Sequence, residues 1–188
     1  MKENWRPGTM IYPLPAVIVS CGKNISESNL ITVAWVGITC SDPAMCYISV
    51  RPERYSYNII KESMEFTINL TTKGMASQTD WIGVRSGKDF NKWKETGLTP
   101  VPGVKVNCPS IDESPLSLEC KVKTIIPLGT HDMFLAEIVN VRAERSLIDE
   151  TTGKFQLEKA NLLTYSHGQY HEVGDIIGHF GFSVRKKS

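Results

Sequence analysis

The chain has 188 residues, enough to bury a sizeable core, and is most economically interpreted as one domain over residues 1–188. Its 21 Lys and Arg residues nearly balance its 20 Asp and Glu residues, so no overall field favours nucleic acid or anionic membranes as partners. Its five cysteines are odd in number and lack C-x-x-C spacing, which argues against a disulfide framework or zinc site and for reduced, mostly buried thiols.

The N-terminal stretch MKENWRPGTM has neither the apolar region nor the cleavage site of a secretory signal. No later stretch is apolar over enough residues to span a bilayer. We therefore predict a cytoplasmic protein without membrane or nucleic-acid partners.

The first seventy residues contain four segments with the composition of β-strands. Ala16–Cys21 is a mainly apolar run, as in a strand buried on both faces. The β-prone run Ile31–Ile38 leads to a turn at Asp42–Pro43 and a second apolar run, Met45–Val50. Glu65–Leu70 alternates apolar and polar residues. Strands linked mainly by turns argue against a doubly wound α/β fold, and no G-x-G-x-x-G follows any of them.

A compact polar cluster, RPERYSY, follows the Met45–Val50 strand. Arg51 and Arg54 are planar, always charged donors, and hydroxyl groups lie beside them, so the cluster can cradle a phosphate dianion. The alternative interpretation is a solvated turn with surface arginines. Ser56 is also placed to cap a short helix that continues through Glu62.

The stretch from Thr72 to Gly97 has a helical pattern. One helix is expected over Met75–Gly83, and another over Asp89–Thr96 that ends at Gly97. Ser86–Lys88 between them lacks the remaining glycine and hydroxyl residue of a Walker loop, so that match is weak.

Two long strands are expected after a loop rich in Pro and Gly. Leu116–Lys123 alternates, which predicts one buried and one solvated face, and Met133–Val141 is apolar at nearly every position, as in a central strand. His131 lies in the turn between them, where a histidine taken alone is more often an exposed bystander. In the tail, His167 and His171 have the spacing of a helical metal pair, but Gly168 and the missing carboxylate pattern lead us to predict no metal site.

These segments carry a family resemblance. T-V-A-W-x-G-x-x-C-S-D-P-x-M, then an apolar strand and S-x-R-P-E-R-Y-S-Y-x-x-I, resembles the flavin reductase-like family, the FMN-binding split barrels that include the flavoredoxins. The segment from Asp80 resembles the family's D-x-x-G-x-x-S-G-x-x-x-D-K-F block, with Asn91 and Trp93 where Asp and Phe are usual. Gly129–Asp132 resembles its G-x-H-x turn. The resemblance implies a mainly β fold, an antiparallel, Greek-key-like split barrel with short peripheral helices.

The resemblance also implies a noncovalent FMN site. It puts the Thr32–Trp35 region near the flavin, His131 beside the flavin ring near the electron partner, and the segments around Ser49–Arg51 and Arg54–Ser56 at the ribityl phosphate. Ser86, Gly87 and Lys92 approach the phosphate side. The implied cofactor-binding residues are Thr32, Val33, Ala34, Trp35, Ser49, Val50, Arg51, Arg54, Tyr55, Ser56, Ser86 and Lys92, and the implied catalytic residue is His131.

The function implied is that of an FMN-dependent oxidoreductase that moves electrons between NAD(P)H or a redox partner and an acceptor. The Gly-rich aromatic tail resembles the family's closing segment and implies a homodimer.

FMN is expected rather than FAD, because the polar cluster suits one phosphate and no dinucleotide fingerprint exists. Two alternatives remain open: a flavin-binding module without turnover, and a cofactor-free split-barrel binding protein. Tyr165 and Tyr170 are expected to pack rather than to stack on a flavin.

Overall fold

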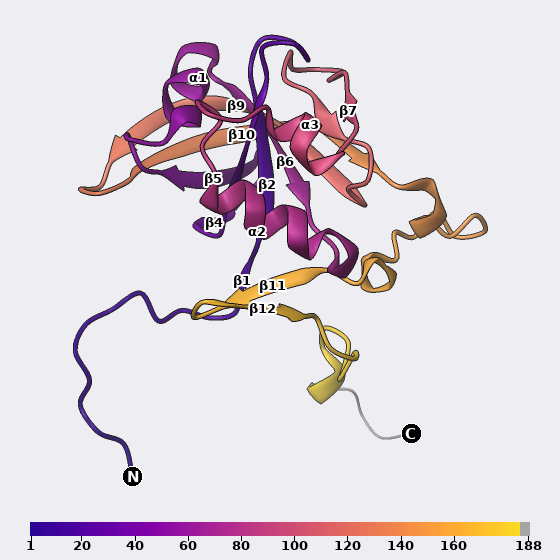
Figure 1. Ribbon diagram of the computed structural model, residues 1–188. Coiled ribbons are helices and arrows are strands. Elements are labelled where there is room, and N and C mark those ends of the chain that lie inside the picture. The colour runs from indigo at the N-terminus through magenta and orange to yellow at the C-terminus, as the bar shows by residue number, and fades with distance from the viewer. Residues whose placement is uncertain (185–188) are drawn as a thin grey trace.

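The computed structural model describes residues 1–184, so the end of the domain expected over 1–188 lies outside the described part. The body is a seven-stranded sheet in which every neighbouring pair is antiparallel (Figure 1). In spatial order its strands are β3 (Asn29–Val33), β2 (Val17–Cys21), β6 (Glu65–Leu70), β9 (Leu116–Pro127), β10 (Asp132–Ala143), β5 (Ala44–Val50) and β4 (Val36–Ser41).

The sheet closes on itself at Ala34 and Trp35. These residues join β3 at one end of the strand order to β4 at the other end, and the backbone N–H of Ser49 in β5 donates to the Trp35 carbonyl at 2.8 Å. The single strand expected over Ile31–Ile38 is therefore wrong. The run has strand composition throughout, but the chain must leave one edge of the sheet and enter the other, so the ladder breaks there.

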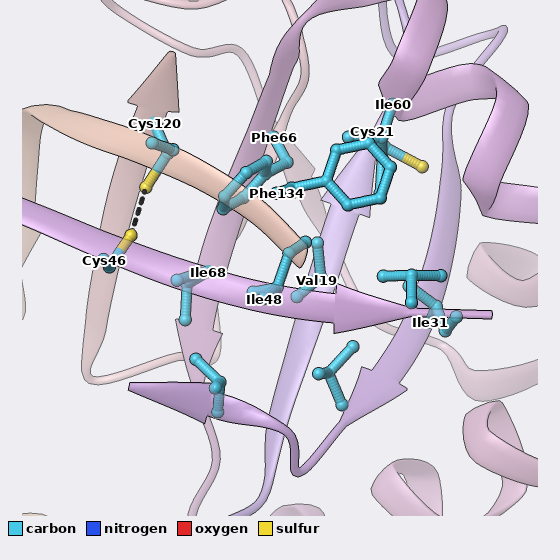
Figure 2. Close-up of a cluster of buried hydrophobic side chains, with 14 of the residues drawn as sticks. Val19, Cys21, Ile31, Cys46, Ile48, Ile60, Phe66, Ile68, Cys120 and Phe134 are labelled. Atoms are coloured by element: carbon cyan, nitrogen blue, oxygen red, sulfur yellow. Dashed lines mark hydrogen bonds between the residues drawn. The ribbon is translucent and has the colours of Figure 1, made fainter. Parts of the chain in front are cut away.

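The inside of the barrel is apolar (Figure 2). Phe66 and Phe134 are fully buried there, and the thiols of Cys46 and Cys120 are in contact at 3.6 Å. All five cysteines are free. Burial raises the pKa of Cys21 to about 12, so its reactive thiolate form is disfavoured. The four buried thiols, which exclude that of Cys40, therefore serve as small apolar filling.

A second apolar layer covers the outer face of β2 and β3. It contains α2 (Ala76–Val84) and α3 (Lys92–Thr96), whose Ile82 and Trp93 pack with Ile18 and Leu30. All five residues of β2 are buried, which confirms a strand covered on both faces. Further short helices are α1 (Tyr55–Ser63), η1 (Lys73–Met75), η2 (Arg145–Leu147), η3 (Leu157–Ala160) and η4 (Phe182–Val184).

Two expectations about helix starts are wrong. Arg54, not Ser56, occupies the N-cap position of α1, because the Ser56 hydroxyl lies inside the helix and accepts a hydrogen bond from the Asn29 amide at 2.7 Å. The helix expected from Asp89 begins only at Lys92, since the Asn91 side chain accepts from the Lys94 N–H at 3.1 Å and caps it there.

The polar face of β9 is solvated as expected at Lys121 and Lys123 but not in the first half of the strand. Ser117 and Glu119 are buried, because the long loop before β9 folds over them. The Glu119 carboxylate accepts hydrogen bonds from the backbone N–H groups of Val104 and Lys105, at 2.9 and 2.6 Å. This loop also contains the paired strands β7 (Pro100–Val101) and β8 (Ser110–Ile111).

A separate three-stranded sheet lies beside the barrel. It consists of β1 (Leu14–Pro15), β11 (Leu163–Ser166) and β12 (Gln169–Glu172). One strand from the N-terminal part of the chain is thus hydrogen-bonded to two from the C-terminal part. The residues before β1 extend away from the body (Figure 1). No helix among residues 1–184 is long and apolar enough to cross a membrane, and the same residues contain no cluster of His, Cys, Asp and Glu suited to a metal ion.

Candidate cofactor site

The largest part of the site is a cavity of about 410 Å³ at the barrel closure, which we call the ring cavity. Its walls come from the end of β3, the end of β5, helix α2 and the C-terminal sheet. The residues that line it are Ala16, Ile31, Thr32, Val33, Ala34, Trp35, Ser49, Val50, Arg51, Arg54, Asp80, Gly83, Val84, His131, Tyr165, Gly168 and Tyr170.

Trp35 and His131 form one wall of the ring cavity. Their rings are nearly parallel, with centroids 6.3 Å apart and planes 9° apart. Partial burial lowers the pKa of His131, and the nearby Arg51 cation lowers it further, against a smaller opposite effect of Glu53. His131 is therefore neutral at pH 7, and its imidazole can both donate and accept a hydrogen bond.

Another part of the ring-cavity lining consists of two tyrosines from the C-terminal sheet. Tyr165 and Tyr170 pack edge to face, with ring centroids 5.8 Å apart. Burial raises the pKa of Tyr170 to about 12, and the adjacent Asp80 carboxylate adds to this shift. The expected packing role for both tyrosines is incomplete, because they line the ring cavity as well as pack together.

A second cavity of about 220 Å³, the phosphate cavity, adjoins the first. The two share Ile31, Arg54 and Val84 in their linings, so they are contiguous. Arg54 lies where they meet, and its Nη2 donates to the Gly83 carbonyl at 2.6 Å. This bond holds the guanidinium in place and leaves its other N–H groups available to an anion.

Lys92 and Arg85 are the other cations that line the phosphate cavity, and Lys92 is the buried one. It is only 3% exposed, and its Nζ donates to the carbonyls of Leu30 and Ile82, each at 2.8 Å. An ammonium has three donors, so one remains. Burial lowers the pKa of Lys92 to about 8, and the Arg54 cation adds to the shift. Asn91 does not disturb the inward orientation of Lys92, because its side chain caps α3.

Position 87, in the wall of the phosphate cavity, requires a glycine. A Cβ on Gly87 would lie 2.1 Å from Oδ1 of Asn29, a buried residue whose amide donates to Ser56. Gly87 thus lets the 86–87 backbone pack closely against Asn29 at the start of β3. The first N–H groups of α1 lack intrahelical partners, and the residues that carry them, Tyr55 and Ser56, line the cavity.

All the side chains predicted from the sequence line one of these two cavities, with one change of place. Ser49 and Arg51 line the ring cavity instead of the phosphate cavity. Arg51 is exposed and pairs with Glu53 at 3.4 Å. The structure adds Asp80 and Asn29, which sequence reasoning missed. Asp80 is the first residue of the D-x-x-G block, a signal that could have identified it, whereas Asn29 carries no local signal.

A sequence model of the flavin reductase-like domain matches residues 9–174. The chain belongs to the flavin reductase-like family. An uncharacterized protein of Archaeoglobus fulgidus is 31% identical to it over 131 residues, which are 70% of this chain and 73% of that protein. The resemblance found in the sequence is thereby confirmed.

Two solved flavoredoxins share the fold. The flavoredoxin of Desulfovibrio vulgaris (Miyazaki F) is 29% identical with a TM-score of 0.90, and covers 98% of this chain and 100% of its own. The flavoredoxin of Methanosarcina acetivorans is 27% identical with a TM-score of 0.87, over the same shares of the two chains. The mainly β, antiparallel split barrel with short peripheral helices is therefore confirmed.

The residues of the site suit the flavin that the flavin reductase-like family binds. The ring cavity offers flat aromatic walls and exposed strand-end backbone, which suit a large conjugated ring. The phosphate cavity offers three cations, Arg54, Arg85 and Lys92, against the one carboxylate of Glu53, and it adds hydroxyl groups and a helix N-terminus, which suit an anion. A Cβ at Gly87 would collide with the Asn29 side chain, so the glycine keeps Asn29 in its place in the wall of the phosphate cavity.

Proposed function

We propose that this protein is an FMN-binding oxidoreductase of the flavin reductase or flavoredoxin type, which moves electrons between NAD(P)H or a redox protein and an acceptor. The observation that carries the proposal is that Arg54 lines both cavities. One ligand can therefore hold a phosphate beside Arg54 and Lys92 while its ring lies beside Trp35 and His131. FMN has these two parts, joined by a short polyol.

The phosphate end of the site provides binding energy. Arg54 and Lys92 are both held by backbone carbonyls, so they are already oriented before a ligand arrives. Charge-assisted hydrogen bonds from such fixed cations, with further donors from Ser86 and the start of α1, bind an anion strongly. This end of the site determines affinity and takes no part in electron transfer.

The ring end of the site determines reactivity. Bound flavin supplies the hydride and single-electron chemistry, and the protein orients and tunes it. His131 is only partly buried, so its neutral imidazole can hydrogen-bond an incoming donor or acceptor at the cavity. The Trp35 ring keeps the imidazole in a plane parallel to its own. His131 is accordingly the residue we assign to catalysis.

We further propose a homodimer with the flavin sites near its interface. Large apolar side chains are strongly exposed on the N-terminal arm, where Trp5 is 78% and Ile11 85% exposed, and on the C-terminal segment, where Ile177 is 95% exposed. Both segments lead directly from the sheet that carries Tyr165 and Tyr170 of the ring cavity. A second copy that covers them would lie close to the cavity. Sedimentation at micromolar concentration tests this, and a monomer would contradict it.

The function is tested in two steps. The apoprotein is first titrated with FMN, and the absence of binding would leave the cofactor-free binding protein as the explanation. The FMN complex is then mixed anaerobically with NADH, NADPH or a reduced redox protein while the visible absorption is followed. Bleaching of the flavin by one of them is expected. A bound flavin that none of them reduces would indicate a module without turnover.

A further inference from the structure

The proposed flavin position gives no role to one group of residues in the lining of the ring cavity. Asp80 comes from α2, and Tyr165 and Tyr170 come from β11 and β12. None of the three lines the phosphate cavity, and the flavin ring is proposed to lie beside Trp35 and His131. We call these three residues the acidic subsite, because Asp80 is the only carboxylate among the residues that line the ring cavity.

The side chain of Asp80 belongs to the cavity face of α2. Asp80, Gly83 and Val84 all line the ring cavity, and residues three and four apart share one face of a helix. The helix is fixed to the barrel next to this face, because the Thr32 hydroxyl donates to the Thr79 carbonyl at 2.5 Å. The backbone that carries the carboxylate is therefore in place before a ligand arrives.

The Asp80 carboxylate is available to a ligand. Asp80 is exposed, and within residues 1–184 no Lys, Arg or His nitrogen lies at ion-pair distance from it. Its neighbour is the Tyr170 hydroxyl, whose pKa is raised by burial first and by this carboxylate second. Tyr170 thus remains a neutral phenol, and it does not compensate the negative charge of Asp80.

Two tyrosine rings accompany this charge. Tyr165 and Tyr170 are directly opposite each other on the antiparallel strands β11 and β12, so their side chains lie on the same face of the C-terminal sheet. Tyr12 packs edge to face against Tyr165, with ring centroids 6.2 Å apart, and supports it from within the same sheet region. The electron-rich faces of aromatic rings attract cations, as a carboxylate does. Both features of the acidic subsite therefore favour the same kind of ligand.

The cations in the lining of the ring cavity do not cancel this preference. Arg51 is exposed and pairs with Glu53 at 3.4 Å. Arg54 also lines the phosphate cavity, so a bound phosphate dianion offsets its charge. His131 is neutral at pH 7, because partial burial and the Arg51 cation lower its pKa. With FMN in place, the charge left to select a second ligand is that of Asp80.

We propose that the acidic subsite binds a flat aromatic cation, such as an N-substituted pyridinium ring, as the second ligand of the ring cavity. The tyrosine faces contact the ring, and the carboxylate of Asp80 pairs with its positive charge. This inference rests on the proposed flavin site and narrows the class of its second substrate. Ring compounds that are cationic in one redox state, such as pyridine nucleotides and dipyridinium electron carriers, are favoured over neutral or anionic rings.

The test compares two ligands that differ in charge and carry no phosphate. Nicotinamide is neutral, and nicotinamide methylated on its ring nitrogen is a pyridinium cation. Calorimetry with the FMN complex should show the cation binding at least about threefold more tightly. The preference should shrink as NaCl is raised from about 0.05 to about 0.5 M, because salt screens a partly exposed charge pair. Equal binding, tighter binding of the neutral ring, or a preference that salt does not change would overturn the proposal.

Asp80→Asn removes the charge and keeps the shape of the side chain. It should weaken binding of the cation roughly three- to tenfold and leave binding of neutral nicotinamide unchanged. Glu62→Gln is the matched control, because it removes the same charge at an exposed position of α1 that lines neither cavity, and it should change neither ligand. Equal losses of both ligands in Asp80→Asn, no loss of the cation, or the same loss in Glu62→Gln would contradict the proposal.

Failure of the proposed function is a separate result. FMN binding is measured first, and its absence would contradict the flavin site itself. A protein that binds FMN but shows no preference for the cation contradicts this inference alone. The comparison of the two ligands and its salt dependence use the wild-type protein, so they test the subsite even where Asp80→Asn fails to fold.

Discussion

Trp35 and His131 lie side by side in one wall of the ring cavity with their ring planes only 9° apart, although one follows β3 and the other precedes β10. The pair exists because β10 is hydrogen-bonded to β5, and the β5 backbone in turn bonds to the Trp35 carbonyl. The histidine in the β9–β10 turn is thereby brought to the place where the barrel closes. An isolated turn would leave it in solvent.

His131→Ala should separate binding from reaction. The variant is expected to keep nearly the affinity of the wild type for FMN, because His131 lines the ring cavity and does not reach the phosphate cavity. Reduction of the bound flavin by a pyridine nucleotide should be slower. Stopped-flow absorbance measures the rate, and calorimetry the affinity. A large loss of FMN affinity at an unchanged rate would show that His131 serves only to hold the ring.

The protonation of His131 should depend on its charged neighbours. Its pKa is lowered from 6.5, by partial burial first and by Arg51 second, so Arg51→Ala should raise its NMR titration midpoint. Glu53→Gln removes an opposing charge and should lower the midpoint. In the wild-type protein the lowered pKa means that the folded chain binds fewer protons at His131 than the unfolded chain below about pH 6.5. The contribution of His131 to the free energy of unfolding therefore decreases as the pH falls through this region. A midpoint unmoved by either variant would show that burial alone causes the shift.

The two arginines should differ, although their positions in the sequence suggest equal roles. Arg54→Ala removes charge-assisted hydrogen bonds worth about 1.5–3 kcal/mol, so the Kd for FMN should rise roughly ten- to a hundredfold. Riboflavin lacks the phosphate and should be nearly indifferent. Arg51→Ala, at a solvent-exposed pair, should cost less than about 0.5 kcal/mol for either ligand. Equal losses of FMN and riboflavin in Arg54→Ala would place the phosphate elsewhere, with Ser86 and Lys92 as the next residues to test.

FMN binding should weaken at alkaline pH because of Lys92. Its pKa is lowered to about 8, so the free protein loses this cation as the pH rises from 7.5 to 9.5. A bound phosphate favours the protonated form, and FMN affinity should therefore fall by up to about tenfold per pH unit over this range. Calorimetry in buffers of different ionisation enthalpy should show proton uptake on binding. Riboflavin is the control and should show neither effect.

The loss of the Lys92 proton at alkaline pH affects stability in the opposite direction from FMN binding: the free energy of unfolding rises where the affinity for FMN falls. Between about pH 8 and the ordinary pKa of 10.5, the unfolded chain holds a proton that Lys92 in the fold has lost. Lys92 therefore contributes more favourably to folding as the pH rises through this window. Lys92→Met should remove the pH dependence of FMN binding. It should also destabilise the fold by about 1–3 kcal/mol, because two carbonyls lose their charged donor.

Gly87→Ala should impair FMN binding through Asn29. The added Cβ would displace the Asn29 side chain and break its hydrogen bond to Ser56, so the phosphate cavity would lose its shape. We expect a roughly two- to tenfold higher Kd for FMN, as for a lost hydrogen bond of about 0.5–1.5 kcal/mol. Gly74→Ala, which meets only the Thr72 hydroxyl at 3.6 Å, is the matched control. Equal affinities of the two variants for FMN would show that the Asn29 side chain moves aside without harm to the phosphate cavity.

The amino-acid sequence by itself determined the local features of this protein. Alternation and apolar runs located most strands of the seven-stranded sheet, including β2 as buried on both faces and β5 after the Asp42–Pro43 turn. The polar cluster after β5 indicated the site. Charged and hydroxyl side chains at a strand end can bind an anion whatever the position of that strand in the sheet, so the cluster is recognisable from the sequence. Motif likeness then extended the site to Ser86, Lys92 and His131.

The tertiary structure alone decided which of these residues act together. Whether Ile31–Ile38 is one strand or two depends on the closure of the sheet, and whether the Glu119 face is wet depends on a loop folded over it. Lys92 points inward because the carbonyls of Leu30 and Ile82 meet at that point. Each of these contacts joins segments far apart in the chain. Such partners come together only when the whole chain packs, so the local pattern of side chains does not identify them.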